Sequence, residues 1–233
     1  MIDERLGKSS DSGQRWRDTS DVTGIQEDEG PVGEGHIQIA HAVSEQFALD
    51  QFVFIPAFHA PHKLRTKPTS AYDRYAMLCL ATQDHPQFSV TKMELELPER
   101  PYSVETLSRI NEQLPGDEIY FVMGADSWRD ITNWREWEKV LSLSNHIVVT
   151  RPGADIVLSH VTDEVRGRIA DLRGHANAPE TLSGERRIYI TDKINIDVAA
   201  SEIRKKIRNG DRSWTTDVPV EVANYIEKYQ IYN

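Results

Sequence analysis

The chain has 233 residues, a formal net charge of −10 and a pI near 5.3. Its 39% hydrophobic and 27% charged residues are typical of a globular domain that is long enough to bury a sizeable core. The acidic balance argues against a general nucleic-acid or membrane-surface binder. Since no stretch has the apolar length of a membrane span and the first residues do not resemble a signal peptide, we expect a cytoplasmic protein.

The single cysteine, Cys79, lies in an apolar stretch of the chain. One cysteine excludes an internal disulfide and a cysteine-based zinc site. We expect Cys79 to be a buried, unreactive thiol.

Residues 1–30 differ in composition from the rest of the chain. They are polar, rich in Asp, Glu, Ser and Gly, and show no periodic apolar pattern. Such composition is typical of disordered segments. We therefore predict that residues 1–30 are disordered or foreign to the domain, and that residues 31–233 form a single domain.

From residue 31 onward, helical and strand patterns alternate. Apolar spacing predicts helices at 33–47, 71–83, 103–114, 134–144, 161–174, 200–210 and 218–232. Short apolar or alternating runs predict strands at 52–56, 88–97 (with a bulge at Lys92), 118–124, 146–151 and 186–193. Ser103 and Ser201 are the expected N-caps of their helices, and Gly174 and Gly210 the expected helix ends. Strands of this kind alternating with helices predict an α/β fold with a doubly wound parallel sheet.

In such a sheet, ligands bind beyond the carboxyl ends of the strands. The segments that follow the predicted strands carry cationic and polar residues, namely His59, His62, Lys63, Arg65, Asp126, Ser127 and Arg151. The helix start at Ser201, with Arg204 three residues later, offers free backbone N–H groups to an anion. Together these groups indicate a site for phosphate groups at one edge of the sheet.

Several of these residues also have simpler interpretations. We expect the isolated loop histidines His59 and His85 to be solvated. The basic residues of 205–208 are expected to form a solvated helix face. Asp126 is equally well explained as a helix cap.

An ordered set of segments carries a resemblance to a known family. The segments are "GHIQIA", "VFIPAFHAPHK", "YDRYAMLCLA", "RPYSVETL", "YFVMGADSWRDITNW", "IVVTRPG" and "VAASEIRKKIRNG". In order and spacing, the chain from Pro31 onward resembles the nicotinate-nucleotide adenylyltransferase family of the nucleotidyltransferase superfamily. The resemblance implies a Rossmann-like fold and adenylyl transfer from ATP to nicotinate mononucleotide. The products would be nicotinate adenine dinucleotide and pyrophosphate, and Mg²⁺ would accompany ATP.

The resemblance also assigns residues to roles. It implies that His36, Lys63 and Arg204 are catalytic; that Gly35, Ser201, Ile203, Gly124, Asp126 and Arg151 bind ATP; and that Ser103, Thr106 and Trp134 bind the nicotinate nucleotide. It assigns no protein ligand to a metal.

The chain departs from the family pattern at the first signature, roughly G-G-T/S-F-D-P-x-H-x-G-H. The end of this signature is present as Gly35 and His36, but its first histidine falls on Gly33 and its glycine-rich start falls on "QEDEG", residues 26–30. The hydrophobic strand that should precede it is not evident, so we predict that the first central strand is missing. Two alternatives stay open: a catalytically impaired nucleotide-binding remnant, and another nucleotidyltransferase, such as one acting on a pantetheine phosphate. The segments 101–107 and 124–134 speak against the second.

Overall fold

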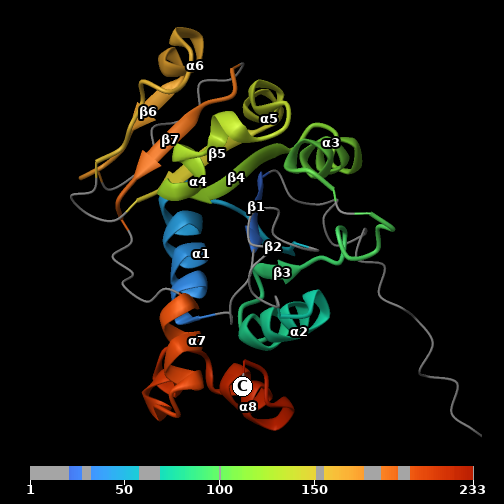
Figure 1. Cartoon of the computed structure of the whole chain (residues 1–233). Coiled ribbons are helices and arrows are strands. Elements are labelled where there is room, and N and C mark those ends of the chain that lie inside the picture. The colour runs from blue at the N-terminus through green and yellow to red at the C-terminus, as the bar shows by residue number, and fades with distance from the viewer. Residues whose placement is uncertain are drawn as a thin grey trace, which may run out of the picture.

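The computed structural model describes residues 21–27, 33–57, 69–99, 101–150, 155–175, 185–193 and 200–232. Within these residues the chain forms one parallel sheet of seven strands in the order β3-β2-β1-β4-β5-β7-β6 (Figure 1). The strands are β1 (Asp21–Glu27), β2 (Gln51–Pro56), β3 (Phe88–Val90), β4 (Glu118–Gly124), β5 (Asn145–Val149), β6 (Ile169–Asp171) and β7 (Ile188–Thr191). The predicted fold class, a Rossmann-like doubly wound sheet, is confirmed.

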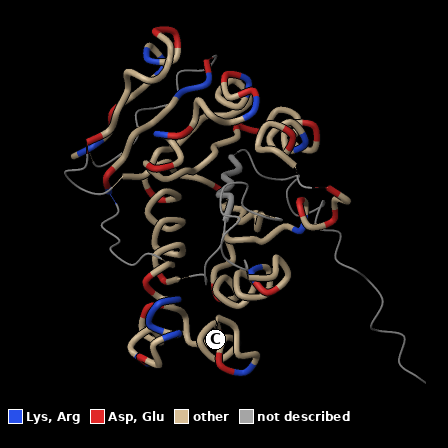
Figure 2. The backbone as a smooth tube through the Cα atoms, viewed as in Figure 1, with Lys and Arg blue, Asp and Glu red and all other residues tan. Residues whose placement is uncertain are grey.

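Helices cover both faces of this sheet. They are α1 (Glu34–Phe47), α2 (Ala71–Ala81), α3 (Ser103–Gln113), α4 (Ala125–Arg129), α5 (Trp137–Leu143), α6 (Asp163–Gly167), α7 (Ala200–Arg208) and α8 (Val220–Tyr229), with short 3₁₀ helices η1 (Ile131–Asn133) and η2 (Arg212–Thr216). Charged residues concentrate on the helices and turns, while the strands are largely free of them (Figure 2). None of the helices in the described part of the chain has the length and apolarity needed to cross a membrane.

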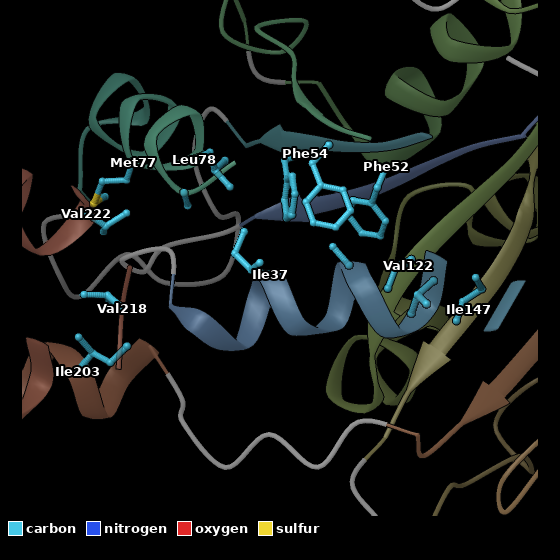
Figure 3. Packing of buried hydrophobic residues seen from close by; sticks show 14 of the residues in the cluster. Ile37, Phe52, Phe54, Met77, Leu78, Val122, Ile147, Ile203, Val218 and Val222 are labelled. Atoms are coloured by element: carbon cyan, nitrogen blue, oxygen red, sulfur yellow. The ribbon is translucent and has the colours of Figure 1, made fainter. Parts of the chain in front are cut away.

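Each face of the sheet has its own hydrophobic core. In β2, Phe52 and Phe54 face the cluster formed with α1, α2, α7 and α8, whereas Val53 and Ile55 face the cluster formed with α3, α4 and α5. Figure 3 shows the first cluster, in which Ile37 of α1 lies beneath the two phenylalanines. Successive strand residues point to opposite faces, so a strand buried on both sides is mostly apolar. This is why the inner residues of β2 and β4 form uninterrupted apolar runs.

The expectation that the first central strand is missing was wrong. Residues Asp21–Glu27 form β1, which pairs with β2 on one side and β4 on the other. The segment has no continuous apolar run, so the local pattern does not identify it. A segment flanked by two strands gains backbone hydrogen bonds on both sides, and this tertiary context outweighs local strand propensity.

Two other predicted elements are shorter or different. The strand predicted at 88–97 ends at Val90 and is followed by turns, so Lys92 is not a bulge within a strand. The helix predicted at 161–174 ends at Gly167, and the chain then forms β6, which pairs with β7. Periodicity alone does not separate a short helix followed by a three-residue edge strand from one longer helix.

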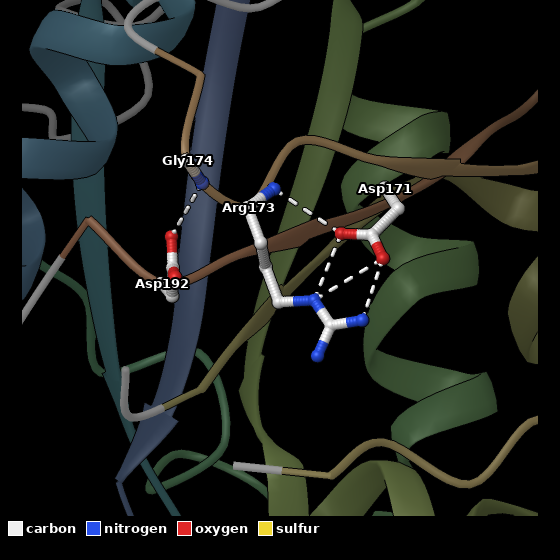
Figure 4. Close-up of polar contacts among 4 residues, drawn as sticks. All are labelled: Asp171, Arg173, Gly174 and Asp192. Atoms are coloured by element: carbon white, nitrogen blue, oxygen red, sulfur yellow. Dashed lines mark hydrogen bonds and ion pairs between the residues drawn. The ribbon is translucent and has the colours of Figure 1, made fainter. Parts of the chain in front are cut away.

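The turn after β6 is held by two aspartates (Figure 4). Arg173 donates from Nε and Nη2 to the Asp171 carboxylate at 2.6–3.1 Å, and this hydrogen bonding lowers the pKa of Asp171. Gly174, with φ +75°, donates its N–H to Asp192 at 3.0 Å. Gly174 therefore supplies a left-handed turn after a strand, not the end of a helix.

Smaller details also differ from expectation. Tyr102, not Ser103, is the N-cap of α3, so Ser103 is the first helical residue. Ser201 lies within α7, which already begins at Ala200, and is therefore not an N-cap. Cys79 is only half-buried, although burial does raise the pKa of its thiol.

Candidate active site

The carboxyl ends of the parallel strands meet along one edge of the sheet. Pairing places Glu27 opposite Pro56 and Gly124 opposite Val149. Between β1 and β4 the strand order reverses, since the chain continues to β2 on one side and to β5 on the other. Such a switch point is where open α/β sheets leave a crevice for a ligand.

Helix α1 begins on this side of the sheet, immediately after the segment that follows β1. Gly33 is its N-cap, and Gly35 and His36 lie in its first turn. The backbone N–H of Gly33 donates to Nδ1 of His36 at 3.2 Å, and the His36 N–H donates to the Gly33 carbonyl at 3.0 Å. Because a backbone N–H can only donate, Nδ1 is the acceptor, and the neutral imidazole carries its proton on Nε2. His36 is therefore held as a hydrogen-bond donor at its outer nitrogen.

The start of α1 packs directly against the segment that follows α7. The backbone N–H of Glu34, which has no partner within its own helix, donates to the Asp217 carbonyl at 2.9 Å. The Asp217 carboxylate in turn accepts a hydrogen bond from Lys206 at 2.6 Å. Asp217 thus joins α1 to α7, and Lys206 is part of this junction, not of a solvated face.

Gly33 allows this close approach. A β-carbon built at Gly33 would lie 3.2 Å from Cδ1 of Ile203 and 3.3 Å from the Asp217 carbonyl oxygen. Both contacts are tighter than ordinary van der Waals distance, so any larger residue requires its neighbours to shift. The position where the family signature has its first histidine is therefore closed by α7 in this chain.

The corner where α1 packs against α7 carries five predicted residues, namely Gly35, His36, Ser201, Ile203 and Arg204. Ile203 is 1% exposed and contacts the start of α1, so the two helix starts pack against each other. Arg204 is half-buried, while Ser201 is exposed. An imidazole N–H donor and a guanidinium are groups suited to phosphate oxygens, which is the role predicted for His36 and Arg204.

The end of β4 supplies a second group. Gly124 is exposed at the strand end and is the N-cap of α4, in which Asp126 is exposed and paired with Arg129 at 3.1 Å. Below them, Trp128 is buried and donates its indole N–H to the Val157 carbonyl at 3.0 Å. Asp126 thus stands at the sheet edge on a turn that is anchored by a buried tryptophan.

The three residues assigned to the nicotinate nucleotide come from two neighbouring segments. Ser103 and Thr106 belong to the first turn of α3, and Trp134 follows η1 with its ring 6.4 Å from that of Phe121. An ion pair of 3.7 Å between Arg135 and Glu105 joins these two segments. The structure therefore places the segments that carry these three residues next to each other, and their binding role stays a prediction.

Glu94 is a buried partner of the predicted site residue Thr106, and the sequence pattern does not indicate it. It is 1% exposed, and Thr106 donates its hydroxyl hydrogen to Glu94 Oε1 at 2.7 Å. A strand reaching residue 97 would have made Glu94 an ordinary alternating polar residue. Since the chain instead turns at 93–96, the carboxylate is carried inward, and the sequence offers no signal for that turn.

Lys63 and Arg151 lie outside the described residues, as do His59, His62 and Arg65. Their predicted roles at the sheet edge stay predictions. His85, expected to be solvated, is instead half-buried and bonded to His41 at 3.1 Å between Nδ1 and Nε2.

The fold and the switch point define a Rossmann-like α/β protein. A family model described as cytidylyltransferase-like matches residues 30–206. A "Probable nicotinate-nucleotide adenylyltransferase" of Geobacter metallireducens is 35% identical over 204 residues, which cover 87% of this chain and 93% of that protein. A protein of the same name from Geotalea daltonii is 34% identical, covering 87% and 94%. The chain belongs to the nicotinate-nucleotide adenylyltransferase family.

Solved structures agree with the fold. The nicotinic acid mononucleotide adenylyltransferase of Plasmodium falciparum, complexed with APC, superposes with a TM-score of 0.65 at 18% identity, covering 91% of this chain and 97% of that one. The same enzyme complexed with NaAD gives a TM-score of 0.63. At this identity, the likeness describes the shared architecture.

Proposed function

We propose that this chain transfers the adenylyl group of ATP to nicotinate mononucleotide, giving nicotinate adenine dinucleotide and pyrophosphate. The observation that carries the proposal is the junction of α1 with α7, in which Glu34 and Gly33 meet Asp217 and Ile203 at the carboxyl edge of the sheet. Family membership supports the same reaction. The proposal requires no covalent enzyme intermediate.

The reaction is a direct displacement at phosphorus. A phosphate oxygen of nicotinate mononucleotide forms a bond to the α-phosphorus of ATP, while the bond from that phosphorus to the oxygen bridging toward the β-phosphate breaks. The electron pair leaves with pyrophosphate. Since both reactants are anions, catalysis depends on positioning and on stabilising negative charge.

In this proposal, each residue of the corner has a separate role in positioning the reactants or stabilising their negative charge. His36 donates from Nε2 to an α-phosphate oxygen, because Nδ1 is occupied by the Gly33 N–H. Arg204 neutralises negative charge on the phosphates, and Ser201, Gly35 and Gly124 line their path. Ile203 holds the two helices together, and Lys63, Asp126 and Arg151 complete the ATP site. Ser103, Thr106 and Trp134 hold the nicotinate nucleotide.

In this proposal Mg²⁺ enters as part of the MgATP substrate. Among the described residues, no group of three or more His, Cys, Asp or Glu side chains gathers in a way that could hold a metal ion. Mg²⁺ commonly binds through substrate phosphates and water rather than a protein cage. When bound, it neutralises part of the triphosphate charge.

The test is pyrophosphate release by the purified chain with ATP, Mg²⁺ and one acceptor at a time: nicotinate mononucleotide, nicotinamide mononucleotide or 4′-phosphopantetheine. We expect release with nicotinate mononucleotide and formation of the dinucleotide. Release only with 4′-phosphopantetheine would contradict the proposal in favour of another nucleotidyltransferase.

An impaired nucleotide-binding remnant is the second candidate, because Gly33 replaces the first histidine of the family signature and "QEDEG" replaces its glycine-rich start. It predicts that ATP binds without turnover under the same conditions. The central strand β1 argues against it, since the sheet is complete between β2 and β4.

A further inference from the structure

Three side chains connect the start of α3 to the turn that precedes α5. The guanidinium carbon of Arg135 lies 4.7 Å from the centre of the Tyr102 ring, within the range of a cation–π interaction. Arg135 Nη1 lies 3.7 Å from Oε1 of Glu105, whose Oε2 accepts the Tyr102 backbone N–H at 2.9 Å. Since each member contacts the other two, these residues form a closed cluster, which we name the Arg135 clamp.

The backbone of the turn next to the clamp has a conformation that residues other than glycine seldom adopt. Glu136 has φ 52° and ψ 42°, the left-handed region that residues other than glycine seldom occupy. Its carboxylate lies 3.9 Å from Arg135 and 3.5 Å from Lys139. Such a conformation persists only where surrounding interactions determine it. The path of the chain from Trp134 into α5 is therefore held by contacts on both sides of Glu136.

The clamp is exposed, and other contacts hold α3 in place without it. Asn111 of α3 donates to the Leu143 carbonyl at the end of α5 at 3.1 Å, and Thr106 bonds to buried Glu94. The side chains of Arg135 and Glu105 are about half exposed, at 54% and 46%. Exposed pairs contribute little to the free energy of unfolding. Loss of the clamp should therefore loosen the start of α3 relative to the turn at Arg135 and leave the fold intact.

Each clamp residue is the immediate chain neighbour of a residue assigned to the nicotinate nucleotide. Tyr102 precedes Ser103, Glu105 precedes Thr106, and Arg135 follows Trp134. We infer that the Arg135 clamp is a positioning device that fixes the start of α3 against Trp134 and so sets the geometry of the pyridine-nucleotide site. This inference rests on the proposed function.

The test measures steady-state kinetics of three variants. Arg135→Gln removes the cation, Tyr102→Leu removes the ring, and Glu105→Gln removes the ion pair while keeping an oxygen to accept the Tyr102 N–H. From the strength of exposed cation–π and ion-pair contacts, each should raise KM for nicotinate mononucleotide about fivefold. KM for ATP and kcat should stay at the wild-type values. High salt should raise the wild-type KM toward that of the variants, because it screens the ion pair.

Arg109→Gln is the matched control. It removes one exposed positive charge from α3, the helix that carries Glu105, but lies outside the clamp and should leave both KM values unchanged. An equal rise of KM in Arg109→Gln would assign the effect to net charge and overturn the inference.

Other outcomes also decide. Unchanged KM for nicotinate mononucleotide in all three variants overturns the inference, as does an equal rise of KM for ATP with a fall in Tm, which would show a structural role. If the wild type shows no turnover, the proposed function fails. The clamp is then judged by calorimetric titration with nicotinate mononucleotide, where weaker binding to the variants supports it and equal binding overturns it.

Discussion

Nδ1 of His36 lies 3.2 Å from the backbone nitrogen of Gly33, three residues earlier in the chain. This hydrogen bond fixes both the orientation of the imidazole and the nitrogen that carries its proton. His36, in the first turn of α1, is thereby oriented as a donor through Nε2. The same contact gives the first prediction.

His36→Asn should keep an acceptor for the Gly33 N–H but lose the donor at the Nε2 position. By comparison with the loss of one stabilising donor at other transition states, kcat should fall by about 10²–10³-fold. Tm should change little, since the helix start keeps its hydrogen bond. A variant with wild-type kcat would remove His36 from the catalytic residues.

Gly33→Ala should destabilise the junction of α1 with α7. The added β-carbon meets Ile203 at 3.2 Å and the Asp217 carbonyl at 3.3 Å, and the carbonyl belongs to the backbone. Overpacking of this kind costs about 1–3 kcal/mol in the free energy of unfolding, which urea denaturation measures. Gly167→Ala is the control, because nothing lies within 4 Å of a β-carbon there. Equal stability of the two variants would contradict the packing described for Gly33.

Thr106→Val should destabilise the protein although the two side chains have nearly the same shape. The substitution removes the hydroxyl that donates to Glu94 at 2.7 Å within the core. Loss of a donor to a buried carboxylate costs about 1–3 kcal/mol or more. Thr216→Val is the control, since Thr216 is exposed and its hydroxyl donates to the nearby Ser213 carbonyl. Urea denaturation measures the free energy of unfolding of both variants. An equal loss of that free energy would show that the Thr106–Glu94 hydrogen bond has no special role.

His146 should make the protein less stable in acid. Burial lowers the pKa of His146 to about 3 from its usual 6.5, and its Nε2 has no partner among the described residues. The unfolded chain therefore binds a proton below pH 6.5 that the folded chain does not bind until about pH 3. The stability that His146 permits is fully present above pH 6.5 and is lost as pH falls through that window.

The measurement is the free energy of unfolding of the wild type and His146→Leu at pH 7 and pH 4.5. The wild type should lose about 2 kcal/mol more than the variant between these two values. Parallel loss in both proteins would show that His146 does not carry the acid sensitivity. His175→Leu is the control, because His175 is exposed and should follow the wild type.

The sequence by itself determined the parallel α/β sheet, because strands buried on both faces are mostly apolar, as residues 52–56 of β2, 119–123 of β4 and 147–149 of β5 are. It also identified the helix starts at Gly35–His36 and Ser201–Arg204 and the segments that carry Ser103, Thr106 and Trp134. Only the tertiary structure decided that Asp21–Glu27 fills the centre of the sheet, because that strand depends on partners from β2 and β4. The tertiary structure alone also decided that α1 and α7 are joined through Asp217 and pack closely at Gly33. It likewise decided that Glu94 is buried against Thr106. These contacts join residues distant in the chain, and their energies depend on distance and burial, which no local pattern encodes.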